Sequence, residues 1–469
     1  VTMYRKEIEG FIDSHREEMI EDICTLCRIN SEKMPYVEGK PYGEGPFQAL
    51  QAALGMAEGY GFSIRNYDNY VGTADLNDKE RQLDILAHLD VVPAGEGWTE
   101  TKPFEPVVKD GKLFGRGTAD DKGPAVAALY AMRAVKELGI PLNKNVRLIL
   151  GTDEECGSSD IVNYYDKEEE APMTFSPDAE FPVINIEKGR LEGHFHASFQ
   201  ASEAMPRLVK VEAGIKANVV PGKARAVVEG LDLKTLEAAA EAVEKETGIS
   251  FVLEGDLPVM TVTAQGEGAH ASTPQEGKNA LTGLLVYLTR LPFAECPQMD
   301  MVKNLLKLFP HGDTCGKAAG ISMEDELSGA LTLAFSMLTV GADGLEGVFD
   351  SRCPICATEE SVLGVVKQAM ADQGFTLEND SMIPPHHVDG NSHFVRTLLS
   401  VYEEYTGLEG SCQATGGGTY VHSLKNGVAY GAALPGTDNR MHGADEFAVV
   451  DELVLSAKIF AQVIVELCS

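Results

Sequence analysis

The sequence predicts an α/β protein in which a mostly parallel central sheet is interrupted by an inserted α+β domain. Three observations support this fold class. Helical and strand patterns alternate in the first third of the chain, a strand-like alternation of polar and apolar residues begins near residue 188, and the helix–strand alternation resumes after Pro384-Pro385. We therefore expect a discontinuous domain over residues 1–187 and 384–469, with a second domain over residues 188–383.

The elements of the first segment follow from apolar periodicity. Helical spacing of apolar residues predicts helices over 4–29 and 46–60, and a further helix, rich in small residues, over 124–138. The runs Leu83-Asp-Ile-Leu-Ala87 and Asn145-Val-Arg-Leu-Ile-Leu150 are short and apolar. Runs of this kind between helices are typical of buried parallel strands, so we expect both in the central sheet.

The later elements are predicted in the same way. Residues 191–199 alternate between polar and apolar side chains, which is typical of a strand with one exposed face. Helices are expected over 234–247, 278–290 and 359–374 in the inserted domain, and over 393–406 and 447–467 after it. At 469 residues the chain exceeds one ordinary hydrophobic core, which agrees with two domains.

The charge balance restricts the classes of partner. The chain has 39 Lys and Arg against 72 Asp and Glu, a formal net charge of −33. Nucleic acids and anionic membranes require basic surfaces, so we expect neither as a partner. The charged start of the sequence has no apolar signal stretch, and we expect a cytoplasmic protein. The acidity can serve solubility, or some carboxylates can be metal ligands.

Nine cysteines are spread along the chain, an odd number that indicates free thiols in a reducing compartment. Two Cys-x-x-Cys pairs, Cys24/Cys27 and Cys353/Cys356, leave a thiolate zinc site or a redox centre as alternatives. The first pair lies among apolar residues at helical spacing. We interpret it as core thiols.

Polar motifs follow the ends of predicted strands. His88 and Asp90 come directly after the strand at 83–87, at the position where open α/β sheets carry their sites. A carboxylate commonly orients a metal-binding imidazole through its other nitrogen, so Asp90 is a candidate orienter of His88. A structural histidine would also explain this motif taken alone.

Further acids follow the same pattern. Asp120 and Asp121 lie in a glycine-rich loop before a predicted helix, where helix capping by one aspartate is the alternative. Three acids, Asp153, Glu154 and Glu155, begin where an apolar strand ends. Crowded like charges are unfavourable unless they are protonated or neutralised by a cation.

The loops after residues 176 and 440 add Asp178 and His442. Two histidines and several carboxylates from separate loops fit a hard or borderline metal pair better than a thiolate zinc site. The combination is specific, whereas its parts are not.

From residue 83 to the C-terminus these motifs resemble those of the ArgE/DapE/aminoacylase/carboxypeptidase G superfamily of metallopeptidases. Within it, three runs are most similar to PepV-type dipeptidases, which are Xaa-His or β-Ala dipeptidase-like: Asp178-Ala-Glu-Phe-Pro-Val-Ile-Asn-Ile-Glu-Lys-Gly189, Gly416-Gly-Gly-Thr-Tyr-Val-His422 and Pro435-Gly-Thr-Asp-Asn-Arg-Met-His-Gly443. The resemblance implies a di-metal exopeptidase-like catalytic domain with residues 188–383 as its lid domain.

The resemblance also implies roles for the acids and histidines. Asp120 becomes the ligand that bridges two divalent metal ions, most often zinc, with manganese or cobalt as alternatives. His88 and Asp178 complete one metal site, and Glu155 and His442 complete the other. Glu154 falls on the general base and Asp90 on a catalytic supporting position. The peptide bond between Asp120 and Asp121 is expected to be cis.

In the inserted domain, His270 matches the lid histidine that donates to the oxyanion. Asn218 and Arg352 match residues that bind the C-terminal carboxylate of a dipeptide substrate, a task for which the planar guanidinium of arginine is suited. A lid of this length implies that one chain supplies its own histidine, so we expect a monomer that hydrolyses unblocked dipeptides.

Three other functions remain open from the sequence. An aminoacylase, a desuccinylase or a carboxypeptidase would share every metal ligand. A non-catalytic metal- or peptide-binding protein would not need Glu154, and a thiol redox protein would need a low thiol pKa. Cys156 and Cys353 follow candidate site residues, which leaves two alternatives: thiols whose oxidation disturbs the site, or small core thiols.

Overall fold

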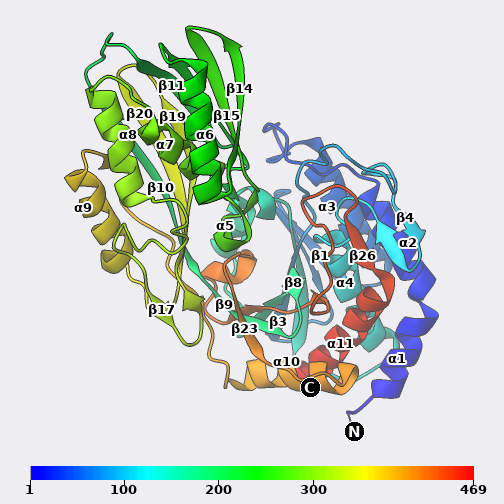
Figure 1. Cartoon of the computed structure of the whole chain (residues 1–469). Helices are drawn as coiled ribbons and strands as arrows, with labels where there is room; N and C mark the ends of the chain where they lie inside the picture. Colours follow the sequence, from blue (N-terminus) through cyan, green and yellow to red (C-terminus); the bar gives the residue numbers. More distant parts are fainter. Residues whose placement is uncertain (1) are drawn as a thin grey trace. The chain divides into compact units, whose positions relative to one another are not determined.

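The computed structural model describes residues 2–469 (Figure 1). The chain packs as two compact units. Unit 1 contains the residues up to Ile186 together with His387–Gln413 and Gly418–Ser469, and unit 2 contains Glu187–His386 and Ala414–Gly417. We describe each unit by itself.

Unit 1 is built on a sheet whose strand order is β1-β2-β6-β3-β7-β24-β9. Strands β6, β3, β7 and β24 run parallel to one another, whereas β1 and β2 at one side and β9 at the other are paired antiparallel. The predicted mostly parallel centre of the sheet is therefore confirmed. The strands are β1 (Ser63–Tyr67), β2 (Val71–Asp75), β3 (Arg81–His88), β6 (Asn145–Gly151), β7 (Met173–Ser176), β9 (Val183–Glu187) and β24 (Gly427–Ala429).

Both faces of this sheet are covered. In β3, Ile85 and Ala87 belong to the large core under helices α4 and α11, and Leu86 between them belongs to a second cluster with Tyr164 and Tyr420. Because successive side chains of a strand point to opposite faces, burial on both sides produces the continuous apolar run seen in the sequence. The helices are α1 (Arg5–Ser14), α2 (Arg16–Cys27), α3 (Glu44–Gly59), α4 (Lys122–Glu137), α5 (Ser159–Tyr165), α10 (His393–Thr406) and α11 (Val450–Cys468).

Two short sheets complete unit 1. One has the order β26-β5-β4 and the other pairs β25 with β8 in parallel. Their strands are β4 (Val107–Lys109), β5 (Lys112–Phe114), β8 (Ala179–Glu180), β25 (Ala432–Ala433) and β26 (Phe447–Val449). The pairing of β26 with β5 brings the C-terminal loop at 434–446 to the glycine-rich loop that follows β5.

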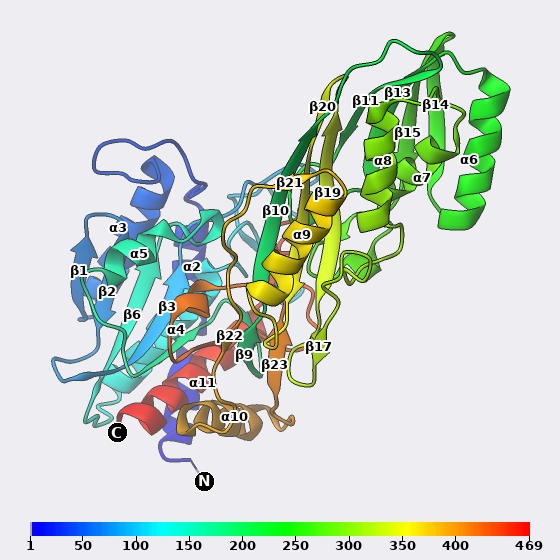
Figure 2. The ribbon, with the colours of Figure 1, turned by 90° about the vertical axis from the view of Figure 1, so that its left-hand side faces the viewer.

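Unit 2 contains an antiparallel sheet of the order β14-β15-β13-β11-β19-β20-β10-β21, which can be followed in Figure 2. One face of the sheet packs against helices, so inward and outward residues alternate along β10 and β13. The strands are β10 (Gly189–Ser198), β11 (Arg207–Ala213), β13 (Lys223–Glu229), β14 (Ser250–Asp256), β15 (Val259–Gln265), β19 (Thr332–Val340), β20 (Gly344–Cys353) and β21 (Thr376–Leu377), and the helices are α6 (Leu233–Thr247), α7 (Ala280–Arg290), α8 (Pro297–Leu308) and α9 (Val365–Asp372).

The structure differs from the predicted elements at three points. The helix expected over 4–29 is two helices, because the backbone of His15 leaves the helical region and its ring stacks on Phe11. The helix expected over 359–374 begins with a π-helical turn over Glu360–Gly364 before α9. The closing helix begins only at Val450, since the three residues before it form β26.

Among residues 2–469, no helix combines the length and the apolar character that a transmembrane helix requires.

Candidate metal centre

The candidate ligands converge at one edge of the unit 1 sheet. His88 is the last residue of β3, Gly151 ends β6 just before Glu154 and Glu155, and Ser176 ends β7 two residues before Asp178. These three strands are parallel, so their carboxyl ends lie at the same edge. Regular strand geometry thus brings together acids that are far apart in the sequence.

Asp120 lies between the two histidines. Its Oδ1 atom is 3.0 Å from His88 Nε2, and its Oδ2 atom is 2.9 Å from His442 Nε2. The carboxylate therefore presents one oxygen to each side, as a bridging ligand must. The peptide bond between Asp120 and Asp121 is cis, as the sequence resemblance predicts.

The other acids surround the same two imidazoles. His88 Nε2 is 3.4 Å from Asp178 Oδ2, 3.7 Å from Glu154 Oε2 and 4.0 Å from Glu155 Oε1. His442 Nε2 is 3.2 Å from Glu155 Oε1. Two groups of ligand atoms are compact enough to hold an ion: His88, Asp120 and Glu155, and His88, Glu154 and Asp178. Which of these atoms belong to which ion stays a prediction.

Burial makes this cluster of carboxylates unfavourable when no cation is bound. Burial raises the pKa of Asp178 to about 7 and that of Glu155 to about 8. The pKa of Glu154 is raised well above its ordinary value by burial and then by the charge of Asp178. These side chains resist being charged at the same time, because they repel one another in a poorly solvated site.

The histidines show the opposite response to the same charges. Hydrogen bonds with Asp120 and Glu155 raise the pKa of His442 to about 10. Burial opposes ionisation of Asp120, but its contacts with His442 and His88 outweigh burial and hold the pKa of Asp120 well below its ordinary value. Protons on the two imidazoles thus provide the positive charge that this acidic cluster requires.

A pair of divalent cations fits the same requirement. The donor set consists of imidazole nitrogens and carboxylate oxygens, the ligands that zinc and manganese accept in proteins. The ring nitrogen of His88 that faces the acids is Nε2, because its Nδ1–H donates to the backbone carbonyl of Asp90 at 2.9 Å. This hydrogen bond orients the imidazole and leaves Nε2 free to coordinate.

The carboxylate of Asp90 has a second task that the sequence did not indicate. It lies 3.3 Å from His88 Nδ1, but its two oxygens also accept hydrogen bonds from the backbone N–H groups of Glu154 and Glu155 at 3.1 and 3.0 Å. Asp90 therefore connects the end of β3 to the acidic turn after β6.

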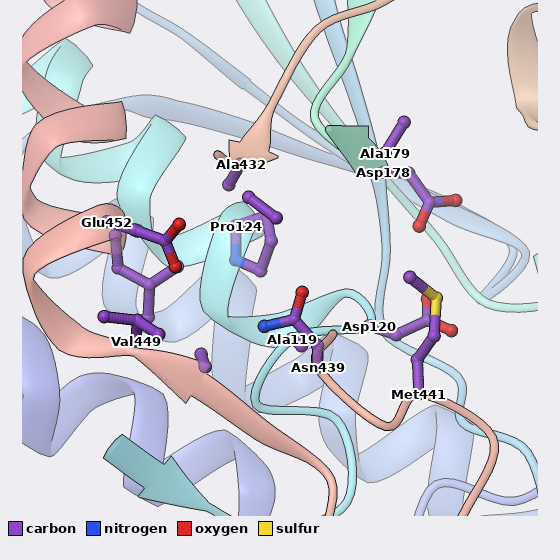
Figure 3. A pocket seen from close by; sticks show the side chains of 13 residues that line it. Ala119, Asp120, Pro124, Asp178, Ala179, Ala432, Asn439, Met441, Val449 and Glu452 are labelled. Carbon is purple, nitrogen blue, oxygen red and sulfur yellow. The ribbon is translucent and has the colours of Figure 1, made fainter. Parts of the chain in front are cut away.

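A small cavity adjoins the metal centre (Figure 3). Asp120 and Asp178 line it together with Met441 and small side chains from β8 and β25. Its volume of about 20 Å³ accommodates about one water molecule, so it is too small for a substrate side chain.

In unit 2, His270 and Asn218 are neighbours. His270 ends the short strand β16 (Ala269–His270), which pairs with β12 (Val219–Val220), and the carbonyl of Asn218 accepts the N–H of Ala271 at 2.9 Å. His270 Nδ1 also contacts the Ser272 hydroxyl at 2.7 Å. The antiparallel pairing of β12 with β16 therefore brings these two candidate residues together.

Arg352 lies in β20 and is buried. Its Nε atom donates to Asp350 at 2.6 Å, and Nη1 donates to the carbonyl of Gly416 at 2.6 Å. These contacts fix the guanidinium in one orientation, which a residue that binds a planar carboxylate requires. Its role toward a substrate stays a prediction.

All nine cysteines are free thiols. Cys353 is fully buried and burial raises its pKa to about 11, whereas Cys156 is exposed beside Glu155. A buried thiol with a raised pKa is poorly reactive, so Cys353 does not fit a redox role.

The sequence reasoning missed several buried residues that support the site, Arg116, Glu446, Asp160 and Tyr420 among them. Asp160 accepts the backbone N–H groups of Thr152 and Asp153, and Tyr420 donates to it. A signal existed, since Arg116 and Tyr420 lie within motifs that carried the resemblance. Their partners are separated from them by hundreds of residues, so their contacts required the fold.

Comparisons with known proteins agree with this geometry. The chain is 35% identical over 461 residues to the putative dipeptidase YtjP of Bacillus subtilis, covering 96% of this chain and 97% of that protein. It is 36% identical over 466 residues to the Beta-Ala-Xaa dipeptidase of Lactobacillus delbrueckii subsp. lactis, covering 97% of each.

Solved structures share the fold at low sequence identity. Human carnosine dipeptidase 1 matches with a TM-score of 0.62 and 15% identity, covering 99% of this chain and 98% of the other. Aminoacylhistidine dipeptidase from Vibrio alginolyticus matches with a TM-score of 0.57 and 14% identity, covering 96% of each. The family model described as Peptidase family M20/M25/M40 matches residues 85–466. With most of its length matched by that model and by relatives above 30% identity, the chain belongs to peptidase family M20/M25/M40.

Proposed function

We propose that this metal-dependent dipeptidase hydrolyses unblocked dipeptides that carry a free C-terminal carboxylate. The single observation that carries the proposal is Asp120, which presents one carboxylate oxygen to each of two histidines within a cluster of buried acids. The names of two relatives, a putative dipeptidase and a Beta-Ala-Xaa dipeptidase, support the choice of a short peptide substrate.

Two divalent ions would occupy the cluster, with zinc as the first choice and manganese or cobalt as alternatives. Asp120 would bridge them, with His88 and Asp178 on one side and Glu155 and His442 on the other. When bound, such ions polarise the scissile carbonyl and lower the pKa of the attacking water.

Glu154 is the general base of the proposed reaction. Its carboxylate lies 3.7 Å from His88 Nε2, and it belongs to neither proposed ligand set. It removes a proton from the attacking water and returns that proton to the leaving amine. Asp90 holds the backbone of Glu154 in place while this proton moves.

Unit 2 provides the proposed recognition of the substrate. The imidazole of His270 donates to the oxyanion, while Asn218 and Arg352 bind the C-terminal carboxylate. Because unit 2 has the length at which the resemblance implies that one chain supplies its own lid histidine, we propose a monomer. The nine free thiols support a reducing, cytoplasmic location.

An aminoacylase, a desuccinylase or a carboxypeptidase would use the same ligands, so substrate preference separates the candidates. The test is a panel of dipeptides, tripeptides and N-acyl amino acids, assayed after chelation and after re-addition of one metal at a time. We expect dipeptides to be cleaved fastest and only with metal restored. Faster cleavage of N-acyl amino acids would contradict the dipeptidase assignment, and undiminished activity after complete chelation would contradict the metal centre.

A further inference from the structure

A buried arginine lies at the junction of three segments that carry candidate ligands. The guanidinium of Arg116 donates through Nη2 to the carbonyls of Pro93 and Ala94 at 3.1 Å each. Through Nη1 it donates to the carbonyl of Gly443 at 3.0 Å. One side chain thus contacts the segment that follows His88 and the residue that follows His442, while its own loop contains Asp120.

Glu446 completes this arrangement. Its Oε1 atom accepts a hydrogen bond from Arg116 Nη1 at 2.9 Å, and both side chains are 1% exposed. Its Oε2 atom accepts the backbone N–H groups of Gly117 and Ala119 at 3.0 Å each and of Asp120 at 3.2 Å. The carboxylate therefore holds the backbone of the loop from which the Asp120 side chain projects.

We propose that Arg116 and Glu446 form a positioning pair that holds His88, Asp120 and His442 at the mutual spacing required for metal binding. Neither residue contacts a ligand atom, so the pair acts only through the backbone of the ligand segments. This inference rests on the metal centre of the proposed function and extends it to residues that support the ligands.

Stability alone is a poor explanation for the pair. Taking an arginine and a glutamate out of water is costly, and a buried ion pair is often no more stabilising than apolar residues of the same volume. The pair instead fixes the relative positions of the backbone segments that it contacts. The planar guanidinium directs N–H groups toward several carbonyls at fixed angles, which the single ammonium of a lysine cannot reproduce.

The chemistry of metal binding explains why such geometry is needed. The ligands come from loops that are far apart in the sequence, and the loop of His442 contains three non-glycine residues with left-handed backbone, Arg440, His442 and Asp445. Left-handed conformations are unfavourable for these residues unless the surroundings hold them. The contact from Arg116 to Gly443 fixes the residue next to His442.

The test is the variant Arg116→Lys of the full chain, which keeps the positive charge and removes the planar guanidinium with its several N–H donors. Zinc affinity is measured by competition with a fluorescent chelator, and thermal unfolding is measured with and without zinc. We expect zinc affinity to fall by about 10- to 100-fold, and the rise in melting temperature on adding zinc to shrink accordingly. Glu446→Gln, which leaves Arg116 in place, is expected to act in the same direction.

Arg133→Lys is the matched control. Arg133 is a buried arginine of unit 1 that pairs with Glu137 and Glu18 and contacts no ligand segment. The substitution Arg133→Lys should leave zinc affinity unchanged even if it lowers the melting temperature. If Arg116→Lys behaves like this control, losing stability but binding zinc as tightly as the unaltered chain, the inference is wrong while the metal centre stands.

Two other results are also decisive. If the unaltered chain binds none of zinc, manganese and cobalt, the proposed function and this inference both fail. If both variants of the pair are unfolded without metal, the zinc concentration that restores the circular dichroism of the folded state replaces the affinity measurement. A midpoint equal to the zinc concentration that saturates the unaltered chain would then contradict the inference, and a midpoint at least about 10-fold higher would support it.

Discussion

The carboxylate of Asp90 accepts a hydrogen bond from the backbone N–H of Glu154 at 3.1 Å, so the residue beside one candidate ligand holds the candidate general base in place. Its second oxygen holds the N–H of Glu155. Asp160 does the same for Thr152 and Asp153. Part of the acidity of this chain therefore serves to satisfy backbone donors in the loops of the site, in addition to solubility and metal binding.

We expect Asp90→Asn to lower kcat/KM for dipeptides by about 10- to 100-fold. The amide has a single oxygen, so it can accept only one of the two N–H groups and turns an N–H toward the other. Steady-state kinetics on a dipeptide will measure the effect. Asp232→Asn is a matched control, because Asp232 also accepts a backbone N–H, from Thr235 at the start of α6 in unit 2, and asparagine caps helices well. Equal activity of both variants would remove Asp90 from the supporting role.

Glu154→Gln is expected to abolish turnover while metal content stays near that of the unaltered chain. Glutamine keeps the shape of the side chain but cannot take a proton from water, and general bases contribute about 10²- to 10⁴-fold to rate. The measurement combines single-substrate kinetics with metal analysis of the purified protein. Glu155→Gln provides the contrast, since it removes a proposed ligand and should lose metal. Retained activity in Glu154→Gln would show that another group is the base.

Asp84 leads to a prediction about pH. It is fully buried in β3, its Oδ1 atom lies 3.2 Å from Arg81 Nε, and burial raises its pKa from 3.8 to about 7. The folded state therefore binds more protons at this site than the unfolded state between about pH 4 and 7. The contribution of Asp84 to the free energy of unfolding is therefore greatest below about pH 4. This contribution is lost as the pH rises from about 4 to about 7.

Asp84→Asn removes this titration. We expect the free energy of unfolding of the unaltered chain to fall relative to the variant by up to about 1.4 kcal/mol per pH unit between pH 5 and 7. Urea unfolding in the presence of a chelator, at a series of pH values, measures the difference. The exposed Asp78 provides the control substitution, Asp78→Asn, which should follow the unaltered chain. Parallel curves for Asp84→Asn and the unaltered chain would contradict the prediction.

The sequence was sufficient for those parts of the site that depend on local pattern. A buried strand that ends in a polar motif can be recognised from the residues alone, and parallel strands place such motifs at one edge. His88 and Glu155 were found in this way, Asp120 was found in a glycine-rich loop before a predicted helix, and the three do lie together. His442 was added as a candidate by its residue type alone, since its loop follows no long strand, and its place in one of the two ligand sets came only from the resemblance.

Contacts between distant segments could not be predicted. Glu446 and Arg116 are separated by 330 positions, and neither has a local pattern that indicates its partner. The break between α1 and α2 at His15 could not be predicted from the spacing of apolar residues, because both helices continue the same amphipathic face. The break accompanies the packing of the His15 ring on Phe11. These features depend on how side chains fit in three dimensions, which periodicity does not encode.

Gly151 offers a final test of the network behind the acidic turn. It ends β6, and a Cβ atom at this position would lie 2.0 Å from the hydroxyl of Tyr420 and 2.5 Å from Asp160 Oδ2. Tyr420 and Asp160 are buried and joined by a hydrogen bond of 2.5 Å, so neither can move without breaking that bond or the contacts of Asp160 with the turn.

We expect Gly151→Ala to lower the free energy of unfolding by about 1–3 kcal/mol, and to lower kcat more than KM changes, because the turn that carries Glu154 shifts. Urea unfolding and dipeptide kinetics measure the two effects. Gly55→Ala is the matched control. Gly55 lies in α3, where an added Cβ atom would meet no other atom within 4 Å, so alanine there should be neutral or stabilise the helix by about 0.5–1 kcal/mol. If Gly151→Ala matches this control in both measurements, the packing of Tyr420 and Asp160 does not position the acidic turn.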